Sequence, residues 1–156
     1  MNYLLFGGQS SVGKSEAIKR LEEFLKRKGI VTSEKSKPLN EEGDFYACLD
    51  GANSAGAKVR ILVSSAADTP PIIRGFKRYC DSHEPYDFII SAIRDDGDPQ
   101  RDNFFSTMGV TPSDYVMEIP MGRIVRINTY DKAVKWYGNA IDVLAHIIVG
   151  NAPFFI

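Results

Sequence analysis

The sequence is short of cysteine, of net charge and of long apolar runs, and each shortage narrows the possible functions. Cys48 and Cys80 are the only cysteines and lack metal-ligand spacing, so we expect two reduced thiols. A formal net charge of −1 gives no overall attraction to nucleic acid or to an anionic membrane. No apolar run approaches the length of a bilayer span, and no basic stretch precedes an apolar one near the N-terminus. We therefore expect a cytoplasmic protein with no membrane segment and no clear nucleic-acid partner.

The remaining composition is ordinary for a globular protein. The chain has 156 residues, of which 44% are hydrophobic and 25% are charged, and this length is enough for one well-buried core. It shows no internal repeat, low-complexity tract or linker. Residues 1–156 are therefore predicted to form a single domain.

One stretch near the N-terminus carries a specific pattern. Residues 8–15, Gly-Gln-Ser-Ser-Val-Gly-Lys-Ser, match the phosphate-binding motif G-x-x-x-x-G-K-[ST] at every specified position. A short apolar run at residues 3–6 precedes them, as expected of a buried strand. Residues 16–26 follow with apolar side chains on one helical face and charged side chains on the other. This strand–loop–helix context favours a nucleotide site over the alternative, a glycine-rich turn with an incidental Lys-Ser pair.

Each specified residue has a physical role in such a loop. Gly8 and Gly13 permit backbone dihedrals and close approaches that a Cβ atom would prevent. The backbone N–H groups can then converge on phosphate oxygens, aided by the positive end of the following helix. Lys14 is expected to reach the β- and γ-phosphates, and the Ser15 hydroxyl is expected to bind Mg²⁺. The predicted nucleotide-binding residues are Gly8, Gln9, Ser10, Ser11, Val12, Gly13, Lys14, Ser15 and Glu16.

Through residues 1–27 the chain resembles the P-loop NTPase superfamily, and the α/β order of its later segments is loosely similar to that superfamily. The resemblance implies a three-layer P-loop NTPase-like fold that binds Mg²⁺ and a nucleotide triphosphate on a mostly parallel sheet. It specifies neither a family nor a substrate.

Apolar runs and helical periodicity predict the order β-α-β, then a hairpin, then β-α-β-α. This order favours an α/β fold with a mostly parallel sheet and helices on both faces. Residues 33–44 lack periodicity, so we expect a surface loop that is either a switch or substrate-binding segment or a solvated connector. The predicted strands are residues 3–6, 30–32, 45–49, 59–63, 86–93 and 115–119, and the predicted helices follow the phosphate loop to residue 28 and span 71–82, 101–108 and about 133–148.

The last predicted helix carries apolar residues at helical spacing, which we expect to face the core. His146 on this helix and His83 near the end of an earlier helix are expected to be structural. The apolar tail at residues 153–156 is expected either to dock on the core or to contribute to an interface. The predicted core stripe is Ala133, Tyr137, Ala140, Ile141, Leu144 and Ile148.

Asp68 is the first candidate for a carboxylate that holds Mg²⁺. It follows the apolar strand at residues 59–63, as the acidic residue of a Walker B element follows its strand. The alternative is that Asp68 caps the helix predicted from about residue 71, and one residue could serve both roles. Asp95 and Asp96, which follow the strand at residues 86–93, are the second candidates for the carboxylate.

Arg94 directly follows the buried strand at residues 86–93. Residues just past the carboxyl ends of parallel strands line the ligand crevice of α/β sheets. Arg94 is therefore a candidate for stabilising phosphate charge, with a solvated turn as the alternative. The candidate catalytic residues are Lys14, Asp68 and Arg94, and the candidate metal ligands are Ser15 and Asp68.

Three functions fit these residues. The first is a Mg²⁺-dependent NTPase or nucleotide-driven switch with a protein partner, and the second is a small kinase that phosphorylates an unidentified small molecule or nucleotide. The third is a module that binds a nucleotide or another anion without turnover. ATP is favoured over GTP because the guanine-specific N-K-x-D pattern is absent. The oligomeric state is left open.

Overall fold

The computed structural model describes residues 1–41, 43–124 and 130–156, and in this part of the chain four helices accompany one six-stranded sheet. In chain order the elements are β1 (Asn2–Gly7), α1 (Lys14–Arg27), β2 (Val31–Lys35), β3 (Tyr46–Ala52), β4 (Lys58–Ser64), α2 (Pro70–Ser82), β5 (Phe88–Ile93), α3 (Pro99–Met108), β6 (Tyr115–Pro120) and α4 (Tyr130–Val149).

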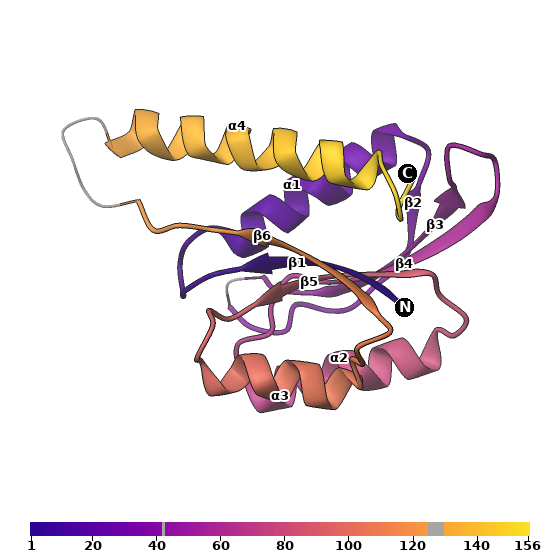
Figure 1. Cartoon of the computed structure of the whole chain (residues 1–156), viewed down its shortest axis with the longest axis horizontal. Helices are drawn as coiled ribbons and strands as arrows, with labels where there is room; N and C mark the ends of the chain where they lie inside the picture. The colour runs from indigo at the N-terminus through magenta and orange to yellow at the C-terminus, as the bar shows by residue number, and fades with distance from the viewer. Residues whose placement is uncertain (42, 125–129) are drawn as a thin grey trace.

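The sheet has the strand order β2-β3-β4-β5-β1-β6. β3 is antiparallel to both of its neighbours, and the other adjacent pairs are parallel. Figure 1 shows α1 and α4 on one face of the sheet and α2 and α3 on the other. The prediction of an α/β fold with a mostly parallel sheet and helices on both faces is therefore confirmed, as is the hairpin that β3 and β4 form.

Each face of the sheet has its own hydrophobic core. Side chains alternate between faces along a strand, so in β1 the buried Leu4 and Phe6 join the core under α1 and α4. Tyr3 and Leu5 join the core under α2 and α3. The sequence of β1 is a continuous apolar run because helices cover both faces of this strand.

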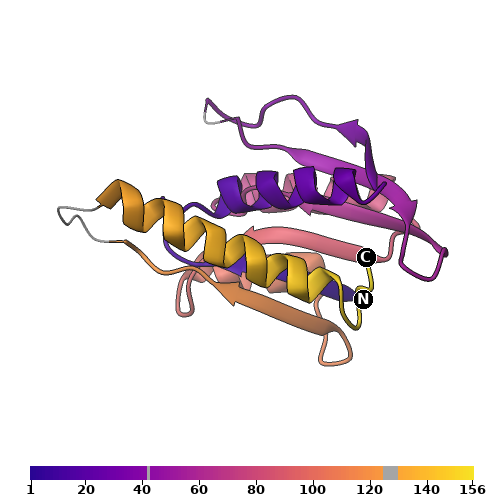
Figure 2. The ribbon, with the colours of Figure 1, turned by 90° about the horizontal axis from the view of Figure 1, so that it is seen from above.

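The C-terminal helix α4 lies between α1 and the edge strand β6 in the view from above (Figure 2). It buries Ile141, Ala145 and Val149, whereas Leu144, which was predicted to face the core, is 40% exposed. The predicted stripe is therefore wrong in part. The reason is that α4 carries apolar residues on most of its sides, so spacing alone does not identify the buried side.

One further difference from the predicted elements concerns the region after α1. β2 extends to Lys35 and so takes up the start of the predicted loop at residues 33–44. The apolar tail at residues 153–156 takes the first of its two expected positions, because it docks on the core through Phe154, whose ring centroid lies 5.2 Å from that of Phe88. In the described residues, no helix has both the length and the apolarity that spanning a bilayer requires.

Candidate functional site

The predicted phosphate loop joins the carboxyl end of β1 to the N-terminus of α1. β1 lies between β5 and β6, and hydrogen bonds continue both pairings to the start of the loop. The N–H of Gly8 donates to the carbonyl of Ile93 at 3.2 Å, and the N–H of Met121 donates to the carbonyl of Gly7 at 2.7 Å. The loop therefore starts at the edge where three parallel strands end, which is where open α/β sheets bind ligands.

The two motif glycines meet specific backbone requirements. Gly8 has φ +154°, and a Cβ atom there would lie 2.6 Å from the carbonyl oxygen of Met121. Gly13 has φ +92° and is the N-cap of α1, without a side-chain capping hydrogen bond. Because only glycine tolerates such dihedrals and approaches without strain, these positions shape the loop.

The loop leaves a row of backbone donors available. Within the described residues, the backbone N–H groups of residues 9–15 make no hydrogen bond to another protein group. Several of them belong to the first turn of α1 and the turn before it, where a helix has no intrahelical acceptors. Free N–H groups at a helix N-terminus attract anions through their dipoles.

Lys14 is the first residue of α1 and is almost fully buried, with 6% of its surface exposed. Its ammonium donates to the carbonyl oxygens of Gly8 and Gln9 at 2.5 and 2.6 Å. Burial lowers the pKa of the Lys14 ammonium, and the nearby Asp68 carboxylate partly offsets that effect. The side chain thus curves over its own loop and places a positive charge beside the free N–H groups.

Ser15 is oriented by a contact with the end of β4. Its hydroxyl donates to the carbonyl oxygen of Ser65 at 2.9 Å. The Ser65 hydroxyl in turn donates to the Asp44 carboxylate at 2.9 Å and accepts the N–H of Phe45 at 2.9 Å. Because the Ser15 hydroxyl donates its proton to the Ser65 carbonyl, the lone pairs of the Ser15 oxygen can coordinate a cation.

Asp68 and Arg94 lie together at the same edge of the sheet. Their side chains approach to 3.1 Å between Arg94 Nε and Asp68 Oδ1, although neither of these buried atoms has a hydrogen-bond partner of good geometry. A guanidinium nitrogen of Arg94 also donates to the hydroxyl of Ser10. Arg94 therefore links the loop to Asp68.

The alternative capping role of Asp68 is wrong, because Thr69 occupies the N-cap position of α2 and no side chain caps that helix. The other two candidate carboxylates differ in position from Asp68. Asp96 is fully exposed and lies 3.9 Å from Arg101, and neither Asp95 nor Asp96 lines a hollow at the loop. The geometry thus favours Asp68 among the three.

A small polar hollow of about 250 Å³ lies on one side of the loop. Lys14, Ser15, Asp44 and Asp68 line it, and hydroxyl and carboxylate oxygens are the ligands that Mg²⁺ prefers. The described residues contain no group of three or more His, Cys, Asp or Glu side chains arranged to hold a metal. The donor set fits Mg²⁺ that takes most of its ligands from phosphate and water.

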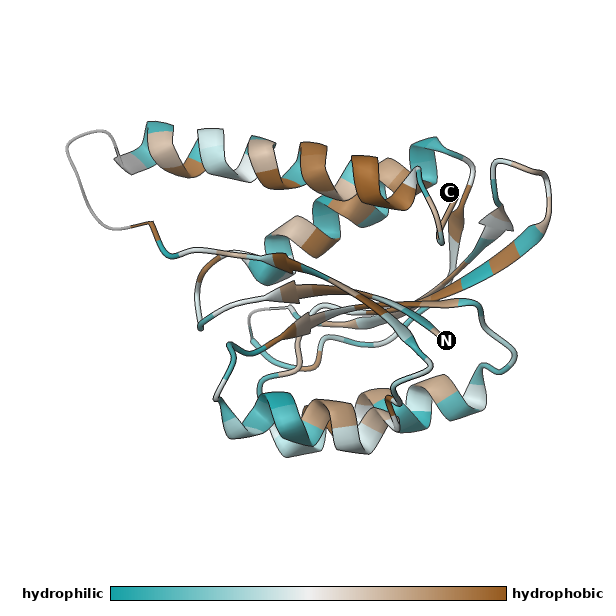
Figure 3. Cartoon of the chain, in the orientation of Figure 1, coloured by the Kyte–Doolittle hydropathy of each residue, from teal (hydrophilic) through white to brown (hydrophobic). Residues whose placement is uncertain are grey.

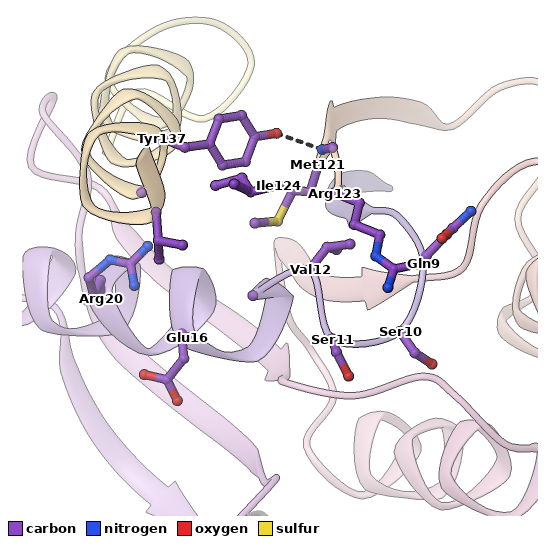
Figure 4. A pocket seen from close by; sticks show the side chains of 14 residues that line it. Gln9, Ser10, Ser11, Val12, Glu16, Arg20, Met121, Arg123, Ile124 and Tyr137 are labelled. Atoms are coloured by element: carbon purple, nitrogen blue, oxygen red, sulfur yellow. Dashed lines mark hydrogen bonds between the residues drawn. The ribbon is translucent and has the colours of Figure 1, made fainter. Parts of the chain in front are cut away.

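A larger pocket of about 850 Å³ lies on the other side of the loop (Figure 4). Residues 9–13 form one wall, the segment from Met121 to Ile124 forms another, and α4 closes it through Val134, Tyr137 and Gly138. The N–H of Gly122 donates to the Tyr137 hydroxyl at 2.6 Å, which ties α4 to the segment after β6. This volume is within the range of cavities that hold small organic ligands.

The predicted site residues are thus gathered at one edge of the sheet. Lys14 and Ser15 end the loop, Arg94 contacts the loop through Ser10, and Asp68 lies beside Arg94. Glu16 lines both hollows. Comparison with protein-family models, with curated proteins and with solved structures found no match. The assignment of this site therefore depends on its own chemistry.

Sequence reasoning missed Asp44, which is 3% exposed and lines the small hollow. It falls in the predicted surface loop, where a charged residue is usually solvated. Asn40, four residues earlier, donates to its carboxylate at 2.7 Å and accepts its N–H at 3.1 Å. An Asn and an Asp at this spacing before a strand suggest a local turn, but not its burial.

Proposed function

We propose that this protein binds a Mg²⁺–nucleoside triphosphate, ATP in preference to GTP, and hydrolyses or transfers the terminal phosphate. The observation that carries the proposal is the loop from Gly8 to Ser15. It combines the complete motif with free backbone N–H groups and the buried ammonium of Lys14 at the carboxyl edge of a parallel sheet.

We propose that the two hollows hold different parts of the ligand. The triphosphate would lie along the N–H groups of residues 9–15, with the nucleoside in the pocket between the loop and α4. Mg²⁺ would lie in the small hollow and be held by the Ser15 hydroxyl and the Asp68 carboxylate. When bound, Mg²⁺ would neutralise charge on the phosphate oxygens.

Lys14 belongs to the loop and Arg94 contacts it through Ser10, while Lys19 also lines the small hollow. On phosphate binding, Lys14 would exchange the carbonyls of Gly8 and Gln9 for phosphate oxygens, which are stronger acceptors. In hydrolysis, a water oxygen bonds to the γ-phosphorus while the bond to the bridging oxygen breaks. The products are a nucleoside diphosphate and inorganic phosphate, and a kinase would use an acceptor hydroxyl in place of water.

Isothermal titration with ATP and GTP, with and without Mg²⁺, tests the proposal, and a phosphate-release assay on the same samples tests turnover. We expect Lys14→Ala to weaken ATP binding by roughly tenfold to a hundredfold, since a hydrogen bond to a charged group contributes about 1.5–3 kcal/mol. The exposed Lys58 at the start of β4 provides a matched control, and Lys58→Ala should bind like the wild type.

Two outcomes would contradict the proposal. If neither nucleotide bound the wild type, or if Lys14→Ala bound ATP as tightly as the wild type, the loop would not be a nucleotide site. Tight binding without any phosphate release or transfer would instead mean that the protein binds the nucleotide without turnover.

A further inference from the structure

The guanidinium of Arg101 joins two strand ends beside the predicted phosphate loop. Arg101 lies in the first turn of α3, and its side chain is 18% exposed. It donates to both carboxylate oxygens of Glu118 on β6, at 3.2 and 2.6 Å. It also donates to the backbone carbonyl of Arg94, directly after β5, at 3.1 Å. One planar side chain therefore holds the ends of the two strands that flank β1.

Arg101 has charged neighbours on one side and an aromatic ring on another. The turn after β5 and the start of α3 are hydrophilic (Figure 3), and Asp96 in this turn lies 3.9 Å from Arg101 Nε. The ring centroid of Phe105, one turn further along α3, lies 5.3 Å from the central carbon of the guanidinium. Because a cation is attracted to the face of an aromatic ring, these contacts together restrict the orientation of Arg101.

Gly7, the residue before the motif, makes room for the Arg101–Glu118 pair. Glu118 lies beside Leu5 in the sheet register, and alternation places Gly7 and Glu118 on the face that α2 and α3 cover. A Cβ atom at Gly7 would lie 1.7 Å from Glu118 Oε1. The Glu118 carboxylate therefore packs directly against the backbone of β1, one residue before the loop begins.

Arg94 is the residue whose orientation depends on this pair. Arg101 binds its backbone carbonyl, and its own guanidinium contacts Ser10 in the loop. Its Nε atom lies 3.1 Å from Asp68 Oδ1, yet among the described residues neither of these buried atoms has a hydrogen-bond partner. A buried polar group without a partner costs free energy that a bound anion would recover. Arg94 is thus fixed at its backbone, whereas its Nε–H still lacks an acceptor.

We propose that Arg101 and Glu118 are positioning residues that aim Arg94 at the terminal phosphate. This inference rests on the proposed function, because it requires a phosphate bound in the loop. By holding the Arg94 carbonyl, Arg101 fixes the direction in which the Arg94 side chain leaves the end of β5, and Glu118 fixes Arg101. A guanidinium that is already in place stabilises the charge that develops on the phosphate oxygens without reorganising during the reaction.

A contribution to stability alone explains these contacts less well. Ion pairs near the surface contribute little to stability, and the side chains of Arg101 and Glu118 are 18% and 27% exposed. A pair of the same form lies near the amino end of β4, and it lines neither hollow at the loop. There, Arg60 donates to both carboxylate oxygens of Asp50 at 2.7 and 3.3 Å and to the carbonyl of His83 at 3.3 Å. Arg60 therefore provides a matched control.

Steady-state phosphate release from Mg²⁺–ATP by the full chain tests the inference. Arg101→Met should lower kcat roughly tenfold or more while KM for ATP stays within about threefold, because misplacing a group that acts in the transition state affects turnover more than binding. Arg101→Lys keeps the charge but not the planar fork, so it should not restore kcat. Arg60→Met should match the wild type in both constants.

Two other variants disturb the pair without changing Arg101. Glu118→Gln removes the carboxylate charge, and Gly7→Ala places a Cβ atom where the carboxylate lies. Both should lower kcat as Arg101→Met does. In the Arg94→Ala background, Arg101→Met should change kcat by less than about twofold, since the side chain that it positions is gone. Circular dichroism verifies that every variant is folded.

Nuclear magnetic resonance of arginine side chains provides a readout that does not require turnover. The Nε–H signal of Arg94 is assigned by its loss in Arg94→Ala. In the absence of nucleotide, this signal should shift or broaden in Arg101→Met and should stay unchanged in Arg60→Met.

The outcomes separate this inference from the proposed function. A wild type that binds no nucleotide would overturn the proposed function, and with it the phosphate as the target of Arg94. An active wild type with unchanged kcat in Arg101→Met and Glu118→Gln would overturn the positioning role alone. An unchanged Arg94 signal in Arg101→Met would do the same, and so would full rescue by Arg101→Lys or equal losses of kcat with and without the Arg94 side chain.

Discussion

The hydroxyl of Ser15 donates to the carbonyl oxygen of Ser65, 2.9 Å away and fifty residues along the chain. This bond connects the start of α1 with the residue just after β4, two strands away from β1 in the sheet. It orients the hydroxyl of Ser15, which lines the small hollow, much as a second-shell partner orients a metal ligand.

Replacing Ser15 should therefore separate metal-dependent binding from nucleotide binding as such. We expect Ser15→Ala to lower the affinity for Mg²⁺–ATP by roughly tenfold or more, because losing a ligand should cost at least as much as losing a second-shell partner of one. Affinity for ATP without Mg²⁺ should change much less. Ser15→Thr is the matched control, because it keeps the hydroxyl. Titration of each variant with and without Mg²⁺ measures the difference, and equal losses in the two conditions would remove Ser15 from the metal site.

Asp68 and Asp95 make a second comparison. Asp68 lines the small hollow and Asp95 does not, so Asp68→Asn should weaken the Mg²⁺ dependence of ATP binding while Asp95→Asn should leave it intact. The change from carboxylate to amide removes one negative charge that attracts Mg²⁺. Titrating Mg²⁺ at fixed ATP measures the effect. The opposite ranking of the two variants would transfer the metal role to Asp95.

Gly8 should be the glycine most sensitive to substitution. Gly8→Ala places a Cβ atom 2.6 Å from a backbone carbonyl at φ +154°, and strained backbone of this kind costs about 1–3 kcal/mol before the clash is added. Gly29 has φ +87° with open space around it, so Gly29→Ala should show the strain alone. Urea unfolding of both variants measures the difference in the free energy of unfolding. Equal losses would mean that the loop adjusts to the added atom.

Glu22 should make the stability of the fold dependent on acid pH. Burial by itself would raise the pKa of Glu22, but hydrogen bonds from Lys35 and Thr32 outweigh it and hold the pKa below its ordinary value of 4.5. A lowered carboxyl pKa means that this stabilisation is complete above about pH 4.5 and is lost as the pH falls through the lowered value.

Glu22→Gln should therefore cost about 1–3 kcal/mol at neutral pH, since it removes a charged hydrogen-bond partner from a buried site. It should also reduce the loss of stability between neutral and acid pH. Glu23→Gln is the control, because the Glu23 side chain is 64% exposed. Urea unfolding at several pH values measures both variants, and parallel pH profiles for Glu22→Gln and the wild type would contradict the assignment.

The sequence predicted the order of the elements because their patterns are local. The apolar runs in β1 and β5 and the glycine-bounded motif each lie within a few residues, and so does the amphipathic pattern of α1. The position of Lys14, Ser15, Asp68 and Arg94 at one sheet edge followed from the rule that parallel strands end at the same side.

The features that were missed depend on long-range packing. Asp44 is buried where the hydroxyl of Ser65, just after β4, donates to its carboxylate, and no local pattern encodes that contact. The position of α4 between α1 and β6 determines which side of the helix is buried. Because α4 carries apolar residues on most of its sides, the sequence does not identify the buried one. The pairing of Arg94 with Asp68 likewise needed the order of β4 and β5 in the sheet.

The hydrogen bond from the Gly122 N–H to the Tyr137 hydroxyl has a thermodynamic consequence. It fastens one side of α4 to a wall of the large pocket, while Arg20 and Asp142 join another side of the same helix to α1. Linkage is reciprocal, so a pocket ligand that binds more tightly when α4 is docked must stabilise the docking of α4 by the same free energy. Hydrogen exchange of the α4 amides, measured with and without ATP, would then report that coupling free energy directly.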